Sequence, residues 1–301
     1  MSPSPIPLYP HQHRHLEADT PAITLIRPSG VGMRVCPVII SSPHSGRAYP
    51  KSFLATTRLS LAELRQVEDA LLDIIVREAS LPAPQLFAEF PRSYVDVNRP
   101  PHALDASMFT TPHHGLAFRP CPYTQSGFGV IPRKAKHGKA IYDGALPGFE
   151  ARHRLTYYYR RFHTTLRQCI ADASKYNSEV VLLDMHSMPS DIQGCDADIV
   201  LGDGNGTTAS MPLMTCLGQT VARHGLRPQH NTPFAGGYIT RHYGKPHAGV
   251  SAIQIEINRR LYLDEYTLRL KSNWRQVAHL IADMTTAIMC HLSQSRTRAA
   301  S

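Results

Sequence analysis

The sequence predicts an α/β fold in which helices cover both faces of a mostly parallel mixed sheet. Short apolar runs typical of buried strands alternate along the chain with segments whose apolar residues recur at helical spacing. The 301 residues, 42% of them hydrophobic, suffice for a large buried core. We find no internal repeat and no linker, and expect one domain at 21–295 between a Pro- and His-rich arm (1–20) and a short tail (296–301).

The first predicted elements lie in the amino-terminal third. The apolar run 35–40 reads as a buried strand that feeds the turn SSPHSG. Ser60 and Glu63 have the spacing of a capping box and open a helical pattern that runs towards Ser80. This pattern breaks near Glu68, which leaves one helix or two open. Residues 92–99 (RSYVDVNR) alternate like a strand that stops before Pro100.

The remaining elements follow a long irregular stretch. Residues 100–148 are rich in Gly, Pro and His and have little periodicity, as in a lid or binding loop. A helix is predicted over 155–170, followed by buried strands at 179–184 and 197–201. In the strand 251–258 the isoleucines face one way, while Gln254 and Glu256 face the other. An amphipathic helix spans 274–292.

Composition excludes several classes of protein. The 32 Lys and Arg exceed the 23 Asp and Glu, but they are dispersed, so we expect no nucleic-acid partner. The nearest approach to a basic run is Arg133, Lys134, Lys136 and Lys139, with no aromatic ladder beside it. No apolar stretch is long enough to cross a membrane, and the first residues lack a signal-peptide core, which predicts a cytoplasmic protein. The 6 cysteines form no CxxC pair and are expected to be reduced thiols.

Three segments carry residues suited to metal chemistry. They are IISSPHSG with His44, VVLLDMHSMP with His186, and IQIEINR with Glu256. Each combines an apolar strand with a polar residue near its carboxyl end, where ligands bind in open parallel sheets. Two neutral imidazoles and one carboxylate form a zinc site whose fourth position stays open for water.

The carboxylate of such a site has to come from another part of the chain. Glu68 and Asp69, with Asp73 a helical turn further on, form the best-placed acidic cluster between the histidines. Asp184 would accept a hydrogen bond from the second nitrogen of His186. Each motif taken alone also fits a buried, hydrogen-bonded histidine or a solvated helix face.

Two other motifs favour structural roles. Ser45 is not a nucleophile of the G-x-S-x-G type, because PHSG lacks that pattern. Residues 202–206 (GDGNG) have neither the lysine of a phosphate loop nor the ligand spacing of an EF-hand, which favours a tight turn near the site entrance.

Taken together, the motifs resemble those of the N-formylglutamate amidohydrolase family. PHSG, the ED of VEDALLDIIV, RSYVDVNR, DMHSMP, DIVLGDGNG and GGYITRHYGKPHAGVSAIQIEINR occur in this order over roughly residues 35–265. The resemblance implies a single three-layer α/β/α domain of the phosphorylase/hydrolase-like kind, related in plan to zinc carboxypeptidases. It also implies a Zn²⁺-dependent hydrolase that removes the formyl group from N-formyl-L-glutamate in histidine degradation.

The same resemblance implies the catalytic roles. His44, His186 and Asp69 match the family's metal ligands, with Glu68 as the alternative carboxylate. Glu256 matches the general base.

Substrate binding is expected from arginine side chains, because planar guanidinium groups suit the two carboxylates of N-formylglutamate. Arg99 is the first candidate to stabilise the oxyanion, and the residues expected to bind substrate are Arg92, Asn98, Arg241, His242 and Tyr243.

Two other functions stay open at this point. One is a related metal-dependent amidohydrolase that acts on another small N-acyl amino acid or acidic peptide. The other is a non-catalytic basic binding protein, which would hold no stoichiometric metal. For the N-formylglutamate hydrolase and for the related amidohydrolase, the expected partner is a small anionic N-acyl amino acid. No membrane is expected to be involved. The sequence leaves the oligomeric state open, as well as closure of the 100–148 region over a substrate.

Overall fold

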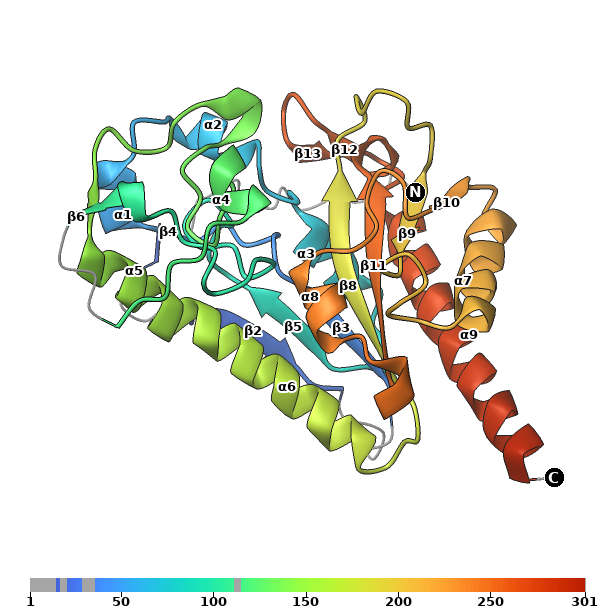
Figure 1. Cartoon of the computed structure of the whole chain (residues 1–301). Helices are drawn as coiled ribbons and strands as arrows, with labels where there is room; N and C mark the ends of the chain where they lie inside the picture. Colours follow the sequence, from blue (N-terminus) through green and yellow to red (C-terminus); the bar gives the residue numbers. More distant parts are fainter. Residues whose placement is uncertain (1–14, 17–20, 29–35, 111–114, 301) are drawn as a thin grey trace.

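A computed structural model describes residues 15–16, 21–28, 36–110 and 115–300 of the chain. Its central sheet has seven strands in the order β10-β9-β11-β8-β3-β5-β2 (Figure 1). In that order the strands span Pro228–His230, Ile199–Gly202, Val250–Asn258, Val180–Met188, Val38–Ser42, Gln85–Ala88 and Ile23–Ile26. Only β11 with β9 and β2 with β5 pair antiparallel among these neighbours. The predicted mostly parallel mixed sheet is confirmed.

Helices lie on both faces of the sheet, as predicted. The helix α6 (Arg160–Ser174) crosses one face, and α3 (Leu72–Glu78), α7 (Met211–Arg223) and α9 (Arg275–Ala300) cover the other (Figure 1). A π-helical turn, Leu155–Tyr159, joins α6 to α5. The other helices are α1 (Lys51–Thr56), α2 (Leu61–Arg65), α4 (Pro122–Ser126), α5 (Gly148–Arg154) and α8 (Tyr238–Tyr243). Short strand pairs outside the central sheet are β1 (His15–Leu16) with β4 (Tyr49–Pro50), β6 (Phe109–Thr110) with β7 (Leu146–Pro147), and β12 (Leu263–Asp264) with β13 (Arg269–Leu270).

The period-2 alternation of the strands builds two cores. On β11, Ile253, Ile255 and Ile257 pack with α3, α7 and α9 in one buried cluster. On β8, Val180 and Leu182 point the other way, into the cluster that includes α6. Every residue of β8 is buried, which explains why its sequence is a continuous apolar run rather than an alternating one.

Polar residues replace apolar ones towards the carboxyl ends of β8 and β11, on the α6 face. Asp184 and His186 continue the series begun by Val180 and Leu182, and the register pairs His186 with Glu256 on β11. The helix α6 contacts β3, β5 and β8, while the short α8 contacts β8 and β11. The polar side chains at this edge of the sheet therefore line a site instead of packing into an apolar core.

The helical pattern after Ser60 forms two helices. Ser60 and Glu63 make the predicted capping box at the start of α2. Between α2 and α3 the chain turns through residues 66–71, and Leu71 takes a left-handed conformation with φ of 62°. The break near Glu68 thus separates α2 from α3 and reverses the chain beside the sheet.

Two secondary-structure predictions were wrong. Residues 92–99 form turns instead of a strand, because their amides bond to loops and side chains: Asp96 N–H donates to Val130 O and Asn98 N–H to the Asp96 carboxylate. The strand predicted at 179–184 extends as β8 to Met188, so that His186 lies inside the strand, whereas β11 matches the predicted strand 251–258 that holds Glu256.

The ends of the chain are described in part. His15 and Leu16 form β1, while His11, His13 and the rest of the predicted arm lie outside the described residues. The helix α9 continues to Ala300, through most of the segment expected as a tail. The domain limits 21–295 stay a prediction. None of the described helices is both long and apolar enough to cross a membrane.

Candidate active site

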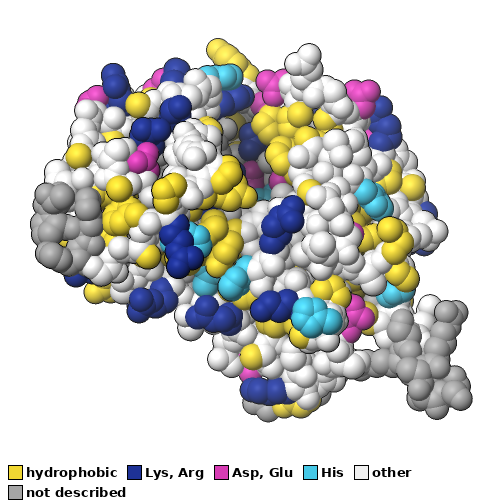
Figure 2. Space-filling model, in the orientation of Figure 1, with side chains coloured by type: hydrophobic (Ala, Val, Ile, Leu, Met, Phe, Trp, Pro, Cys, Tyr) yellow, Lys and Arg dark blue, Asp and Glu magenta, His cyan; other side chains and the backbone are white. Residues whose placement is uncertain are grey.

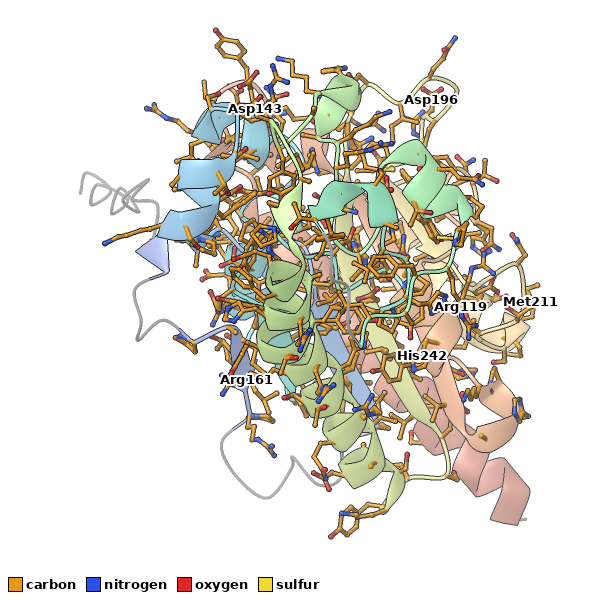
Figure 3. All side chains as sticks on the ribbon, turned by 60° about the vertical axis from the view of Figure 1, so that its left-hand side comes forward. Arg119, Asp143, Arg161, Asp196, Met211 and His242 are labelled. Carbon is orange, nitrogen blue, oxygen red and sulfur yellow. The ribbon has the colours of Figure 1, made fainter. Side chains whose placement is uncertain are left out.

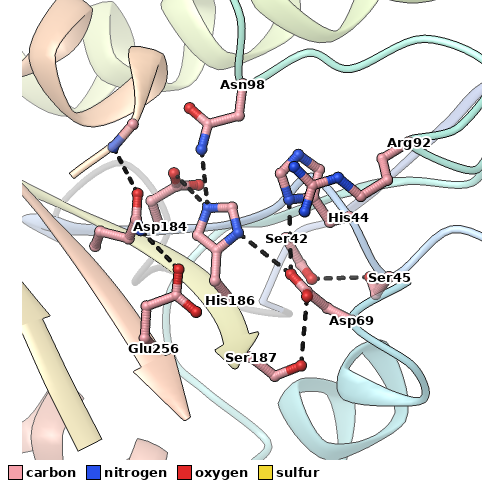
Figure 4. A network of polar contacts seen from close by, with 12 residues as sticks. Ser42, His44, Ser45, Asp69, Arg92, Asn98, Asp184, His186, Ser187 and Glu256 are labelled. Carbon is pink, nitrogen blue, oxygen red and sulfur yellow. Dashed lines mark hydrogen bonds and ion pairs between the residues drawn. The ribbon is translucent and has the colours of Figure 1, made fainter. Parts of the chain in front are cut away.

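Two histidines and an aspartate from distant parts of the chain meet at the carboxyl edge of the sheet. His44 follows β3, Asp69 lies in the turn between α2 and α3, and His186 lies on β8 (Figure 4). Asp69 Oδ2 is 3.2 Å from His186 Nδ1 and 3.7 Å from His44 Nδ1. One ligand atom from each residue falls within 4.8 Å of the others, and all three residues are buried. Among the described residues this is the one such group.

The turn before α3 decides which carboxylate faces the histidines. Asp69 N–H donates to His44 O at 3.0 Å, which aligns the two segments. Glu68 points elsewhere: its carboxylate accepts from Tyr49 Oη at 2.6 Å and from Arg65 Nε at 3.2 Å. Of the two acids that the sequence left open, the structure places Asp69 in the cluster.

The hydrogen bonds of His44 leave its Nδ1 facing the cluster. His44 Nε2 lies 2.7 Å from Asp96 Oδ1, and the carboxylate there accepts the imidazole N–H. With its proton on Nε2, His44 has an acceptor lone pair on Nδ1. That atom is buried without a hydrogen-bond partner among the described residues. A buried unpaired acceptor is rare, and a coordinated cation would satisfy it.

His186 has the same arrangement with another carboxylate. Its Nε2 is 2.9 Å from Asp184 Oδ2, the contact that the sequence predicted for Asp184. Asp184 is completely buried and also accepts from Ser41 Oγ. Both imidazoles are therefore oriented by an outer carboxylate and present Nδ1 to the common centre.

Glu256 lies beside the cluster on the neighbouring strand. Its Oε1 accepts from Gln254 Nε2 at 2.7 Å, and Gln254 Oε1 accepts from Gly237 N–H (Figure 4). Burial, with the nearby Asp69 charge, raises the pKa of Glu256 to about 7, although His186 and two arginines oppose the shift. A carboxyl group with such a pKa can both accept and return a proton near neutral pH.

The pKa shifts of His44 and Asp69 suit cation binding, although Asp184 and Asp69, acting against burial, raise the pKa of His186. Burial, together with the charge of Arg92, lowers the pKa of His44 to about 4, so its imidazole is neutral at pH 7. Burial alone would raise the pKa of Asp69, but His186, His44 and Arg259 outweigh it and hold that pKa well below the ordinary value. A neutral imidazole and an ionised carboxylate are the forms that bind metal.

A cavity of about 480 Å³ opens onto this cluster. Its lining has five Lys and Arg residues and three carboxylates. Figure 2 shows the hollow in the upper part of this face, with acidic and histidine side chains in its depth. The walls come from the residues after α2, the 92–99 segment, the 123–136 loop and the 233–237 loop. An anionic small molecule fits the balance of charge.

Five residues of the RSYVDVNR segment line the cavity, and among them are Arg92, Asn98 and Arg99, for which a role at the substrate was predicted. Arg92 Nη2 donates to Asp96 Oδ2 at 2.9 Å and lies close to His44 (Figure 4). Asn98 Oδ1 accepts from Ile239 N–H at 2.7 Å. The Arg99 guanidinium is held at the cavity wall by the hydrogen bonds that it donates to Phe128 O and Asn98 O.

Gly237 is needed where the 233–237 loop meets Asn98. A Cβ at that position would lie 2.3 Å from Asn98 Nδ2. Any side chain there would displace the Asn98 amide, whose Nδ2 lies 3.3 Å from His186 Nε2. The GG of the GGYITRHYG motif therefore has a steric function at the cavity wall.

Three residues predicted to bind substrate lie outside the cavity lining. Arg241, His242 and Tyr243 belong to the α8 helix, whose period turns successive residues in different directions. Arg241 is exposed and donates to Gly236 O, and His242, labelled in Figure 3, is also exposed. Tyr243 is buried, and its hydroxyl lies 2.9 Å from His163 Nδ1. Their place in a linear motif could not reveal these directions.

Asp96 and Arg259 are among the residues in contact with the cluster that were not assigned a role from the sequence. Asp96 orients His44, as described above. Arg259 follows β11 directly, and its Nη2 lies 2.6 Å from Glu68 O and 3.3 Å from Asp69 Oδ1. Its Nε also donates to Ser187 Oγ at 3.1 Å. Both residues stand within the quoted motifs, so a search for charged residues at the strand ends would have found Arg259.

The other motifs have structural roles in the described residues. Ser45 Oγ bonds to Ser42 Oγ at 2.8 Å, and no histidine of the described residues hydrogen-bonds to it as a base would. In the 202–206 turn, Asp203 Oδ1 accepts from Gly206 N–H and from Asn231 Nδ2. This turn supports the 233–237 loop, because Gly204 N–H donates to Ala235 O at 2.6 Å.

Comparisons with known proteins agree on one family. The family model of N-formylglutamate amidohydrolase matches residues 36–263. N-formylglutamate deformylase of Pseudomonas putida is 30% identical over 255 residues, covering 76% of this chain and 82% of that protein. The enzyme of the same name from Pseudomonas aeruginosa is 28% identical over 236 residues, covering 76% and 83%. The crystal structure of N-formylglutamate amidohydrolase from Ralstonia eutropha JMP134 matches with a TM-score of 0.84 at 28% identity, covering 92% of this chain and 100% of that one.

Proposed function

The chain belongs to the N-formylglutamate amidohydrolase family, and from that premise we propose that it hydrolyses N-formyl-L-glutamate to formate and L-glutamate with one bound zinc ion. The family and its named members make the protein a hydrolase that acts on an amide. Zinc and the identity of this substrate are the proposed parts.

The donor set of the cluster supports a zinc site. His44 Nδ1, His186 Nδ1 and Asp69 Oδ2 are two imidazole nitrogens and one carboxylate oxygen, the ligand types of catalytic zinc sites with an open fourth position. The unpaired buried Nδ1 of His44 is the feature that a metal-free role explains worst. Asp96 and Asp184 hold the two rings in the orientation that binding requires.

A bound zinc ion would supply Lewis acidity, which lowers the pKa of a water and polarises the formyl oxygen. Glu256 accepts the proton of the attacking water and returns it to the leaving amine, since its pKa of about 7 suits both transfers. The carboxylate keeps its orientation through the hydrogen bond from Gln254.

Arg92 is better placed than Arg99 to stabilise the developing oxyanion. Its charge acts on both His44 and Glu256, the residues on either side of the reacting amide. The Arg99 guanidinium donates to two backbone carbonyls and lies over the Tyr123 ring. Arg99 and Asn98 instead form the wall against which the α-carboxylate of the substrate binds.

The convergence of the three ligand atoms beside Glu256 in one cavity carries this proposal. The test combines metal analysis of the purified protein with formate release from N-formyl-L-glutamate, N-formyl-L-methionine and N-acetyl-L-glutamate. We expect one zinc per chain and preferential turnover of the first compound. His186→Ala should lose both the metal and the activity.

The alternatives give different results. One zinc per chain with turnover of another N-acyl amino acid, but not of N-formyl-L-glutamate, would indicate a related amidohydrolase. Activity that survives in His186→Ala would show that the ligand assignment is wrong.

A further inference from the structure

The densest group of basic residues in the sequence borders the cavity. Lys134 and Lys136 line it, whereas Arg133 and Lys139 of the same segment do not. The segment belongs to the 123–136 wall and its continuation, and its two lysines share the lining of the cavity with His186 and Glu256. The hydrolytic chemistry described above uses none of these four residues.

The two pairs of basic residues differ in their partners. Lys139 Nζ lies 2.7 Å from Glu63 Oε1, and Arg133 Nη1 lies 3.5 Å from Asp105 Oδ2. Lys134 and Lys136 make no ion pair and no side-chain hydrogen bond with any residue that the structure describes. Arg133 and Lys139 therefore attach the segment to the protein, while the charges of the other two are neutralised by no acid in the described part of the chain.

Both unpaired lysines are half-buried. Partial burial of a lysine covers its aliphatic stem and leaves the ammonium at the cavity, where it can pair with an anion. The remaining cations of the cavity have such partners, because Arg92 and Arg99 face Asp96, and Arg259 faces Asp69. An anionic group of a ligand is the partner that the lysines lack.

The backbone fixes the position of Lys134. The N–H groups of Arg133 and Lys134 both donate to Gly127 O, at 2.9 and 3.1 Å. The Lys134 side chain crosses Gly127 so closely that a Cβ there would lie 2.8 Å from its Cδ. Gly127 also has φ of 89°, in the left-handed region that favours glycine. The lysine stem is thus supported along its length, which reduces the entropy lost when its ammonium binds a ligand.

We infer that Lys134 and Lys136 bind the side-chain carboxylate of an N-formyl dicarboxylic amino acid, and that they select glutamate over its neutral amide, glutamine. This inference rests on the proposed function, which places the formyl amide at the cluster of His44, Asp69 and His186. The α-carboxylate is attached next to the amide nitrogen and stays near Arg99 and Asn98. The side-chain carboxylate extends away from the cluster, towards the opposite wall.

The test compares formate release from N-formyl-L-glutamate and N-formyl-L-glutamine, which differ only in the charge and polarity of one terminal group. Lys134→Met and Lys136→Met keep most of the aliphatic stem and remove the ammonium. We expect the ratio of kcat/KM for the two substrates to fall by about tenfold or more in each variant, mainly through KM for N-formyl-L-glutamate. Arg133→Met and Lys139→Met are matched controls from the same segment and should keep the wild-type ratio.

A parallel binding measurement separates this inference from the proposed function. Titration calorimetry with glutarate and with its monoamide needs no turnover, and should show weaker glutarate binding in both lysine variants. If wild-type protein hydrolyses neither substrate but the lysine variants lose glutarate binding, the proposed reaction is wrong, while the proposed carboxylate site at the two lysines is supported. An unchanged substrate ratio with unchanged glutarate binding, or an equal loss for both substrates, would overturn the subsite.

Discussion

Asp96→Asn tests the idea that the cluster is held ready for a metal by its outer carboxylates. The two oxygens of Asp96 accept three hydrogen bonds: Oδ1 from His44 Nε2 at 2.7 Å and from Asn98 N–H at 2.9 Å, and Oδ2 from Arg92 Nη2 at 2.9 Å. An asparagine has the same shape but carries an NH₂ group on one side. Whichever way the amide turns, that NH₂ faces a donor instead of an acceptor.

The size of the expected loss in Zn²⁺ affinity follows from these contacts. One charge-assisted hydrogen bond, worth about 1.5–3 kcal/mol, is replaced by a repulsive contact. In either orientation His44 loses the negatively charged acceptor that keeps its proton on Nε2 and its Nδ1 free, since a neutral amide oxygen or an NH₂ group takes its place. Loss of such an outer partner typically lowers metal affinity by about 10–100-fold, and we expect that loss for Zn²⁺ in Asp96→Asn.

Competition with a chromophoric chelator measures the Zn²⁺ dissociation constant directly, and thermal unfolding of the same samples checks the fold. Asp73→Asn is the matched control, because Asp73 is also paired with an arginine, Arg47, but lies outside the cluster. A wild-type dissociation constant in Asp96→Asn, or an equal loss in Asp73→Asn, would refute the reasoning.

Three further predictions concern the base and the arginine behind Asp69. Glu256→Gln should keep zinc but lose at least about 100-fold in kcat, since a positioned base contributes about 10²–10⁴-fold; a normal kcat would remove Glu256 from the reaction. The raised pKa of Glu256 means that its basic form is lost as pH falls, so kcat/KM should decline with an inflection above its ordinary value of 4.5 and no higher than about 7; a profile flat down to pH 4.5 would contradict this. Arg259→Met should weaken zinc binding about 10-fold or more, by freeing Asp69 Oδ1, whereas Arg260→Met, which removes a pairing with Asp198 at 2.7 Å, should not. Chelator competition on both arginine variants measures the difference, and equal affinities would exclude the positioning role of Arg259.

Local patterns were sufficient to predict the layers of the fold. The alternation of Ile253, Ile255 and Ile257 against Gln254 and Glu256 indicated which side of the strand is apolar, and the two cores confirm it. The capping box at Ser60 was equally local. Residues 92–99 show where such patterns fail, because residues 93–98 are all buried, apolar and polar alike, in turns whose amides bond to Val130 and to Asp96.

In the candidate site too, some residues could be predicted from local patterns and others could not. His44, His186 and Glu256 were found from sequence because each is tied to a strand, and parallel strands bring their carboxyl ends to one edge of a sheet. Arg241 shared a motif with Glu256 but projects from a short helix, where the direction of a side chain changes by roughly 100° per residue.

By itself the sequence determined the types of residue, their order along the chain and the strands that carry them, since those depend on neighbours only a few positions apart. The tertiary structure alone decided that Asp69 and not Glu68 faces the histidines and that Asp96 and Arg259 contact the cluster. It also decided that Lys134 and Lys136 have no ion-pair partner among the residues described. Each of these depends on the path of a turn and on partners far away in the chain, such as the left-handed Leu71 after Asp69. A small rotation there exchanges adjacent side chains between the core and the cavity, and only contacts with the rest of the fold fix that rotation.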